Sequence, residues 1–222
     1  MPPRATGSEQ PGIEAALIFF HHKGDDARFD EILVKRIQLL RECPTEGLEA
    51  NTHHIIAENS MARRRYAHAL LHNEPCLAFW RALNRPDSLG AACMQRGVIL
   101  KGMGYPDEAR TLWNEALEHF EYASNPHGTG SCLHELADLH RESGALGEAV
   151  LMARQAIQCF TQADDIAAVH AVEGTLGDIY RDRGQCEEAR ALYQRGLDYW
   201  RSRNHPRWIA KFEQCLQSLP TK

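Results

Sequence analysis

The sequence lacks a long apolar run, paired cysteines and an excess of positive charge. Its longest apolar stretch near the N-terminus, residues 15–20, is much shorter than the ~20 residues that a membrane-spanning helix needs, and no basic region precedes it as in a signal peptide. The seven cysteines are an odd number without any Cys-x-x-Cys pair, which argues against a disulfide framework. A net charge of −5 disfavours general binding of nucleic-acid phosphates. We therefore expect a cytoplasmic protein with reduced cysteines that binds neither membranes nor nucleic acid.

What the sequence does have is an internal repeat with a period of 40 residues. Three consecutive segments, which begin at Gly90, Gly130 and His170, align without a gap. Glycine recurs at positions 104, 144 and 184, and a Glu-Ala pair follows each of these glycines at the same distance. A degenerate copy of the repeat precedes the three segments, and Arg64 takes the place of the recurring glycine in it. A period of this length is typical of a repeat architecture.

Each repeat has the pattern of two helices. Apolar or small residues recur at helical spacing in 131–143 and again in 146–163. Gly144 separates the two, because glycine accepts the left-handed conformation that ends a helix. Columns of small residues predict close helix contacts within a repeat. The expected contacts join Gly97, Ala137 and Gly177 to Ala109, Ala149 and Ala189.

The order of glycine or alanine, aromatic, glycine, alanine, aromatic and small residue resembles the tetratricopeptide repeat. The third copy carries it as Gly177, Tyr180, Gly184, Ala189, Tyr193 and Gly196. The resemblance covers residues 90–203 well and 50–89 weakly, and the long period is similar to that of the kinesin-light-chain-like branch and of some bacterial regulators. It implies an all-α fold: a right-handed superhelix, or α-solenoid, of about five helix hairpins plus a C-terminal capping helix.

The repeat phase divides the chain into seven segments. Residues 1–11, rich in Pro, Gly and Ser, are expected to be disordered. Residues 12–49 would form a helix pair that either caps the array, as a degenerate repeat, or stands apart as a partner-binding helix. A degenerate repeat at 50–89 precedes three repeats at 90–129, 130–169 and 170–205. Residues 206–222 would form the capping helix and tail that cover the last apolar face.

Several fragments carry residues typical of chemistry, but packing explains them better. His134-Glu135 with His140 resembles a zinc-protease motif at the wrong spacing, because the second ligand would fall at Asp138. His68 and His72 stand four residues apart, and we interpret them as a surface or partly packed pair. The tryptophans at 80, 113 and 200 and most cysteines lie in apolar columns and are expected to be core. The sequence thus predicts a non-catalytic protein with no metal and no cofactor.

One set of polar residues, which we call the polar strip, is not explained by packing in the core. It lies on the first helix of each repeat. In the tetratricopeptide family, the residues at these repeat positions line the concave groove. We predict a partner-binding groove here, although the same residues could be only a solvated face with weak helix-surface ion pairs. The chaperone-tail clamp of the family needs Lys and Asn in these columns, whereas this chain has Asp138 and Asp178, which favours a partner of basic or mixed charge. The strip comprises Glu58, Gln95, Lys101, His134, Glu135, Asp138, Arg141, Glu142, Asp178, Arg181 and Asp182.

These features predict an adaptor or scaffold that binds a protein or peptide partner. The kinesin-light-chain-like period suggests a cytoskeletal filament or a cargo as that partner. The alternative is a peptide-sensing regulatory subunit. The sequence leaves self-association open and does not name the partner, because groove specificity depends on a few exposed side chains.

Overall fold

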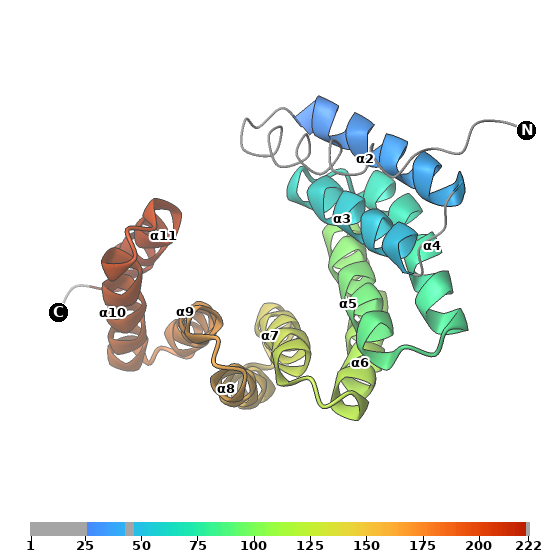
Figure 1. Cartoon of the computed structure of the whole chain (residues 1–222). Coiled ribbons are helices and arrows are strands. Elements are labelled where there is room, and N and C mark those ends of the chain that lie inside the picture. Colours follow the sequence, from blue (N-terminus) through green and yellow to red (C-terminus); the bar gives the residue numbers. More distant parts are fainter. Residues whose placement is uncertain (1–25, 43–46, 221–222) are drawn as a thin grey trace, which may run out of the picture. The chain divides into compact units, whose positions relative to one another are not determined.

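The computed structural model describes residues 26–42 and 47–220, in which every regular element is an α-helix (Figure 1). Neither described stretch contains a β-strand, so the predicted all-α fold is confirmed. The chain forms two compact units, residues 1–105 with α2–α5 and residues 106–222 with α6–α11. The helices are α2 (Asp26–Glu42), α3 (Leu48–Ala62), α4 (Tyr66–Ala82), α5 (Pro86–Met103), α6 (Pro106–Tyr122), α7 (Pro126–Glu142), α8 (Leu146–Gln162), α9 (Ile166–Asp182), α10 (Cys186–Ser202) and α11 (Pro206–Gln217).

The 40-residue period consists of two helices and two turns. Helices α7, α8, α9 and α10 are each 17 residues long, and three-residue turns join them. The helix pairs begin at Pro86, Pro126 and Ile166, four residues ahead of the starts placed from the sequence. The shift arises because a periodic alignment fixes the repeat length but not the residue at which a helix begins.

Two columns of residues with positive φ end the helices. The first holds the predicted glycines Gly104, Gly144 and Gly184, with φ of 90°, 80° and 78°. Arg64 adopts the same conformation in the degenerate repeat, at φ 57°, so the turn persists without its glycine. The second column was not predicted from the sequence, because it contains no glycine; Asn and Asp also tolerate this conformation. Its members are Asn84, Ser124, Asp164 and Asn204, with φ of 49°, 53°, 56° and 50°.

In the first unit, α2 packs on α3, and the α3–α4 hairpin packs on α5. Phe29, Leu33 and Ile37 of α2 are buried against Ile56 of α3. Helix α2 includes the predicted stretch 32–40, whereas the predictions for residues 1–11 and 13–20 lie outside the described residues. Whether residues 12–49 form a true repeat or a separate helix remains a prediction.

In the second unit, small residues let the repeat helices approach closely. Ala137 and Ala149, predicted to face each other, are both fully buried in the same cluster. Gly177 differs from the prediction: a Cβ built on it would meet the ring of Tyr193, 2.5 Å from Cε1. Its neighbour on the second helix is therefore this aromatic ring.

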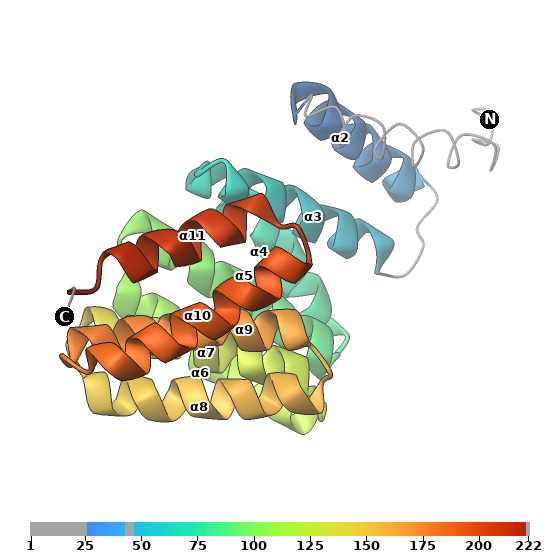
Figure 2. The ribbon, with the colours of Figure 1, turned by 90° about the vertical axis from the view of Figure 1, so that its left-hand side faces the viewer.

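Helix α11 covers the end of the second unit, as expected of a cap, and lies alongside α10 (Figure 2). Phe212 is 1% exposed and fits against the backbones of Gly174 and Gly196. Trp208 stacks on the buried Trp200 with ring centres 5.1 Å apart. The apolar face of the last repeat is thus removed from water.

The described cysteines are free thiols, three of them buried, in line with the expectation of small packed residues. Trp113 and Trp200 are buried as predicted, while Trp80 is only partly buried. Within the described stretches, no helix combines the length and the apolar character that crossing a bilayer would demand.

Candidate functional site

Most of the strip predicted from the sequence lies on α7 and α9 in the second unit. The hairpins stack with one period between them, so side chains 40 residues apart in sequence take equivalent positions on the two helices. Side chains from both helices, together with α11, outline a pocket of about 280 Å³. Its lining residues are His134, Glu135, Asp138, Arg141, Thr175, Asp178 and Lys211.

A hydrogen bond joins the two helices on one side of the pocket. His134 Nε2 lies 2.8 Å from Thr175 Oγ1. This contact gives the His134 ring a structural partner in the next repeat. Thr175 was not among the predicted residues, although it shares the column of Gln95 and Glu135, which were; the repeat phase is the signal that could have identified it.

An ion-pair network connects the repeats on the other side. Arg141 Nη2 lies 3.0 Å from Asp138 Oδ1 on its own helix, and Arg141 Nη1 lies 3.1 Å from Asp182 Oδ2 on α9. Arg181 pairs in turn with Asp178 at 3.0 Å and with Asp182 at 3.1 Å. Burial lowers the pKa of Arg141, but hydrogen bonds to Asp138 and Asp182 raise it above its usual value. Both arginines are therefore fully charged and held in place by carboxylates of the strip.

Asp178 is also held from the second helix of its repeat. The hydroxyl of Tyr193 on α10 donates to Asp178 Oδ1 at 2.7 Å. Burial of Tyr193 and this hydrogen bond raise the pKa of the phenol well above its usual range, so the hydroxyl remains a donor at any physiological pH. The sequence identified Tyr193 as an aromatic repeat position and did not reveal that its hydroxyl reaches the strip.

Lys211 brings a positive charge to the pocket from the capping helix. Its Nζ lies 4.7 Å from the centre of the Trp208 ring, a cation–π arrangement. The lining thus has three carboxylates, from Glu135, Asp138 and Asp178, and two cations, from Arg141 and Lys211. Carboxylates outnumber cations by one in this lining. Glu142 lies exposed near the end of α7 and does not line the pocket.

The remaining strip residues belong to the first unit. Glu58 lies 3.6 Å from His54 on α3; burial lowers the pKa of His54, but hydrogen bonds to Cys76 and Glu58 raise it to about 9. Lys101 is half-buried on α5.

Gln95 departs from the prediction of an exposed groove position, because it is only 4% exposed. Its amide donates to His54 O and accepts from Asn73 Nδ2. These two bonds tie α3, α4 and α5 together inside the first unit. The helical period placed Gln95 beside the strip, but it could not show that neighbouring helices close over this position.

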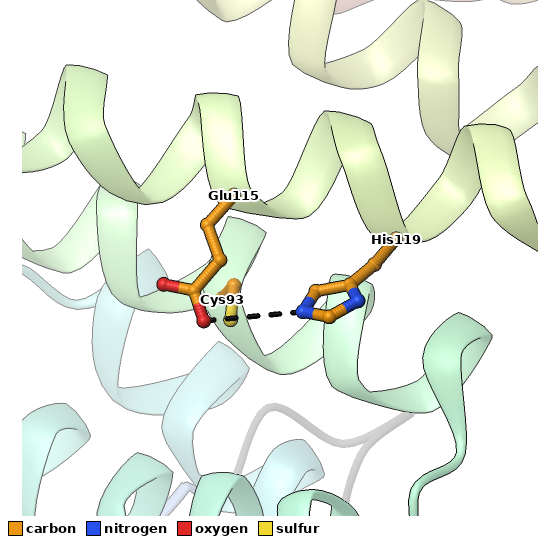
Figure 3. A group of neighbouring side chains, drawn as sticks. All are labelled: Cys93, Glu115 and His119. Atoms are coloured by element: carbon orange, nitrogen blue, oxygen red, sulfur yellow. Dashed lines mark ion pairs between the residues drawn. The ribbon is translucent and has the colours of Figure 1, made fainter.

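A histidine–carboxylate pair on α6 was not predicted from the sequence. His119 Nε2 lies 3.9 Å from Glu115 Oε1, one helical turn away (Figure 3). Pairs at this spacing add a few tenths of a kcal/mol to helix stability. The i,i+4 spacing in the sequence is the signal that could have identified it.

Two parts of the chain match the family described as tetratricopeptide repeat, residues 90–162 and residues 174–204. None of the curated proteins matches the sequence. Among solved structures, the chain is similar to BtubC (BKLC) from P. vanneervenii, with a TM-score of 0.72 and 17% identity over 87% of this chain and 80% of that one.

Two further solved structures are similar. The kinesin light chain nearly identical TPR-like repeats of Podosopora anserina have a TM-score of 0.67 and 17% identity over 89% of this chain and 97% of that one. The Rap conjugation gene regulator of the plasmid pLS20, solved in complex with the Phr* peptide, has a TM-score of 0.77 and 19% identity over 89% of this chain and 55% of that one. At these identities the likeness establishes the fold.

Proposed function

We propose that this chain, two parts of which match the tetratricopeptide-repeat family, is a non-catalytic adaptor that binds a segment of a partner protein along α7 and α9. The observation that carries the proposal is the pocket between these helices, since its lining side chains come from consecutive repeats and from the cap. A peptide lying across the hairpins would contact several repeats at once. The phases involved are those that line the groove in the family.

The charges of the pocket favour a partner with at least one lysine or arginine. A carboxylate accepts up to about four hydrogen bonds, so Asp138 and Asp178 can receive a ligand cation in addition to their present partners. Arg141 and Lys211, which also line the pocket, would hold a neighbouring acidic group. A segment of mixed charge therefore fits better than a uniformly acidic tail.

The test is fluorescence anisotropy with labelled peptides of equal length and basic, mixed or acidic composition. Asp138→Asn with Asp178→Asn should weaken binding of basic and mixed peptides about tenfold or more, because a hydrogen bond to a charged group contributes ~1.5–3 kcal/mol. Glu187→Gln with Glu188→Gln is the matched control, since it removes two carboxylates from the exposed first turn of α10. Tightest binding of acidic peptides, or an equal loss in the control, would refute the assignment.

A cytoskeletal filament or a cargo is the more specific partner that the kinesin-light-chain-like repeats suggest. Co-sedimentation of the protein with polymerised filaments tests the first, again with the Asp138→Asn, Asp178→Asn variant and its control. Sedimentation that the pocket variant does not change would place any filament contact elsewhere on the chain.

The second candidate is a peptide-sensing regulatory subunit, which the similarity to a peptide-bound Rap regulator supports. In that case a short peptide would change the conformation of the protein in addition to filling the pocket. Hydrogen exchange separates the two functions. A sensor should gain protection in helices away from the pocket when peptide binds, whereas an adaptor should gain protection only in the helices that line it.

A further inference from the structure

The two carboxylate oxygens of Asp178, in the pocket between α7 and α9, have different surroundings. Oδ1 accepts the hydroxyl hydrogen of Tyr193 at 2.7 Å and lies 3.0 Å from Nη1 of Arg181. Among the described residues, Oδ2 has neither a hydrogen bond nor an ion pair of this kind. Oδ2 is therefore the oxygen that remains available to a ligand.

The Tyr193 hydroxyl is fixed at Oδ1 because its ring has no room to move. The ring is fully buried, and a Cβ built on Gly177 would lie 2.5 Å from its Cε1. In the preceding repeat Ala153 occupies the column of Tyr193 and has no hydroxyl to offer. The repeated aspartates Asp138 and Asp178 are thus not equivalent, since only the second is held by a buried phenol.

The occupied oxygen matters because a guanidinium and an ammonium bind a carboxylate differently. Arginine typically donates two parallel N–H bonds to the two oxygens of one carboxylate, whereas the lysine ammonium is a compact charge whose three donors can rotate. At Asp178 the second arm of a ligand guanidinium would meet the oxygen that Tyr193 and Arg181 already occupy. That N–H group would lose water without gaining an acceptor. An ammonium needs only Oδ2.

Other groups of the lining complete the environment of an ammonium. Thr175 precedes Asp178 by three residues on α9, so both side chains lie on the same face of that helix. The hydroxyl oxygen of Thr175 has two acceptor lone pairs, and its contact with His134 Nε2 uses at most one of them. Because carboxylates outnumber cations by one in the lining, a single ammonium balances its charge.

We propose that the pocket selects lysine over arginine in the partner segment, and that Tyr193 sets this preference by occupying Oδ1 of Asp178. The inference rests on the function proposed above and narrows its ligand from a basic side chain to a primary ammonium. Tyr193 does not line the pocket; it is a positioning residue that acts through Asp178. The ligand ammonium donates to Oδ2 of Asp178 and to Thr175, while Glu135 and Asp138 add negative charge from α7.

The experiment measures the ratio of two dissociation constants on the same full-length protein. Fluorescence anisotropy is recorded with two labelled mixed-charge peptides that differ only in carrying one lysine or one arginine. The wild-type protein should bind the lysine peptide about fivefold more tightly than the arginine peptide. Tyr193→Phe should reduce this preference to about twofold or less, because Oδ1 then becomes open to the second arm of the guanidinium. A general loss of stability would change both constants by the same factor and leave the ratio unchanged.

Tyr180→Phe is the matched control. It removes a phenol hydroxyl from the same unit, one that accepts from Arg154 Nη2 and lies outside the pocket lining, so it should keep the wild-type preference. Arg181→Gln serves if Tyr193→Phe does not fold, as judged by circular dichroism. This variant removes the cation beside Oδ1 and should reduce the preference in the same direction.

The Asp138→Asn, Asp178→Asn variant separates this inference from the proposed function. If it binds both peptides as tightly as the wild type does, the proposed function is wrong. If it binds both more weakly, but the wild-type protein binds the arginine peptide at least as tightly as the lysine peptide, only the lysine selectivity is wrong. A preference that Tyr193→Phe and Arg181→Gln leave unchanged, or that Tyr180→Phe reduces equally, would overturn the role of Tyr193.

Discussion

Gly177 and Tyr193 provide the sharpest test of how the repeats pack. The phenol ring is fully buried, and its hydroxyl is held by Asp178 at 2.7 Å, so the ring has little freedom to move aside. A methyl group at Gly177 would lie 2.5 Å from Cε1 and 2.9 Å from Cδ1 of that ring. In the preceding repeat the same two columns hold Ala137 and Ala153, both fully buried. Residue size is thus matched across these two columns: Gly faces Tyr in one repeat, and Ala accompanies Ala in the other.

The size of the effect follows from two opposing contributions. In a helix interior alanine is more favourable than glycine by about 0.8–1.0 kcal/mol, and Gly177 lies inside α9. Overpacking of a rigid neighbour costs about 1–3 kcal/mol. Gly177→Ala should therefore lower the free energy of unfolding by up to ~2 kcal/mol. In a Tyr193→Ala background the clash is gone, and the same substitution should stabilise the protein by up to ~1 kcal/mol.

The assay is a double-mutant cycle by urea unfolding, monitored by circular dichroism. Tyr193→Leu provides a milder second background, since Tyr193→Ala removes a buried aromatic ring and should itself cost about 3–5 kcal/mol. A coupling energy of about 1–3 kcal/mol between positions 177 and 193 is expected. If Gly177→Ala has the same effect with and without the tyrosine ring, the packing described for these columns is incorrect.

Three other predictions follow from the same structure. Ala149→Leu, in a fully buried position of the second unit, should cost about 1–3 kcal/mol by overpacking, and an unchanged melting temperature would show that the repeat phase is misplaced. Because the pKa of His54 is raised from 6.5 to about 9, its contribution to stability should be complete below pH 6.5 and be lost as the pH rises through 9; His54→Gln should remove this decline in urea midpoints. Arg141→Glu with Arg181→Glu should keep the helix content, because ion pairs that are still partly exposed to solvent contribute little, yet weaken anisotropy-measured binding of mixed-charge peptides.

The all-α fold and the period could be predicted because they depend on local rules repeated several times. The turn glycine recurs in three successive repeats, and each occurrence supports the interpretation of the others. The second column of turn residues could not be predicted in this way. Ser124 and Asn204 take the same left-handed conformation, but the residue type differs between repeats, so the alignment does not reveal the column. The period alone does not fix where a helix begins, but proline does: Pro126 and Pro206 were expected to open helices, and α7 and α11 begin there.

The candidate site was predictable in its position along the helices and not in its contacts. Repetition indicated Asp138, Arg141 and Asp178, and the structure brings them to one pocket. Lys211 completes that pocket from the capping helix, outside the repeats, and Thr175 completes it from the column of Gln95 and Glu135, which the sequence did identify. Burial of Gln95 likewise depends on bonds to α3 and α4, which no single-helix pattern contains.

The pocket lies where the repeats cease to be alike. Identical columns, such as Asp138 with Asp178, would by themselves give a uniform charged track that recognises charge and little else. The differences add shape: the column of His134 holds Gly174 in the next repeat, which leaves room for Phe212 of the cap. Lys211, one residue earlier on the same helix, then reaches the pocket. The repeated residues build the helical frame, and we infer that partner selectivity resides in the positions where that repetition is broken.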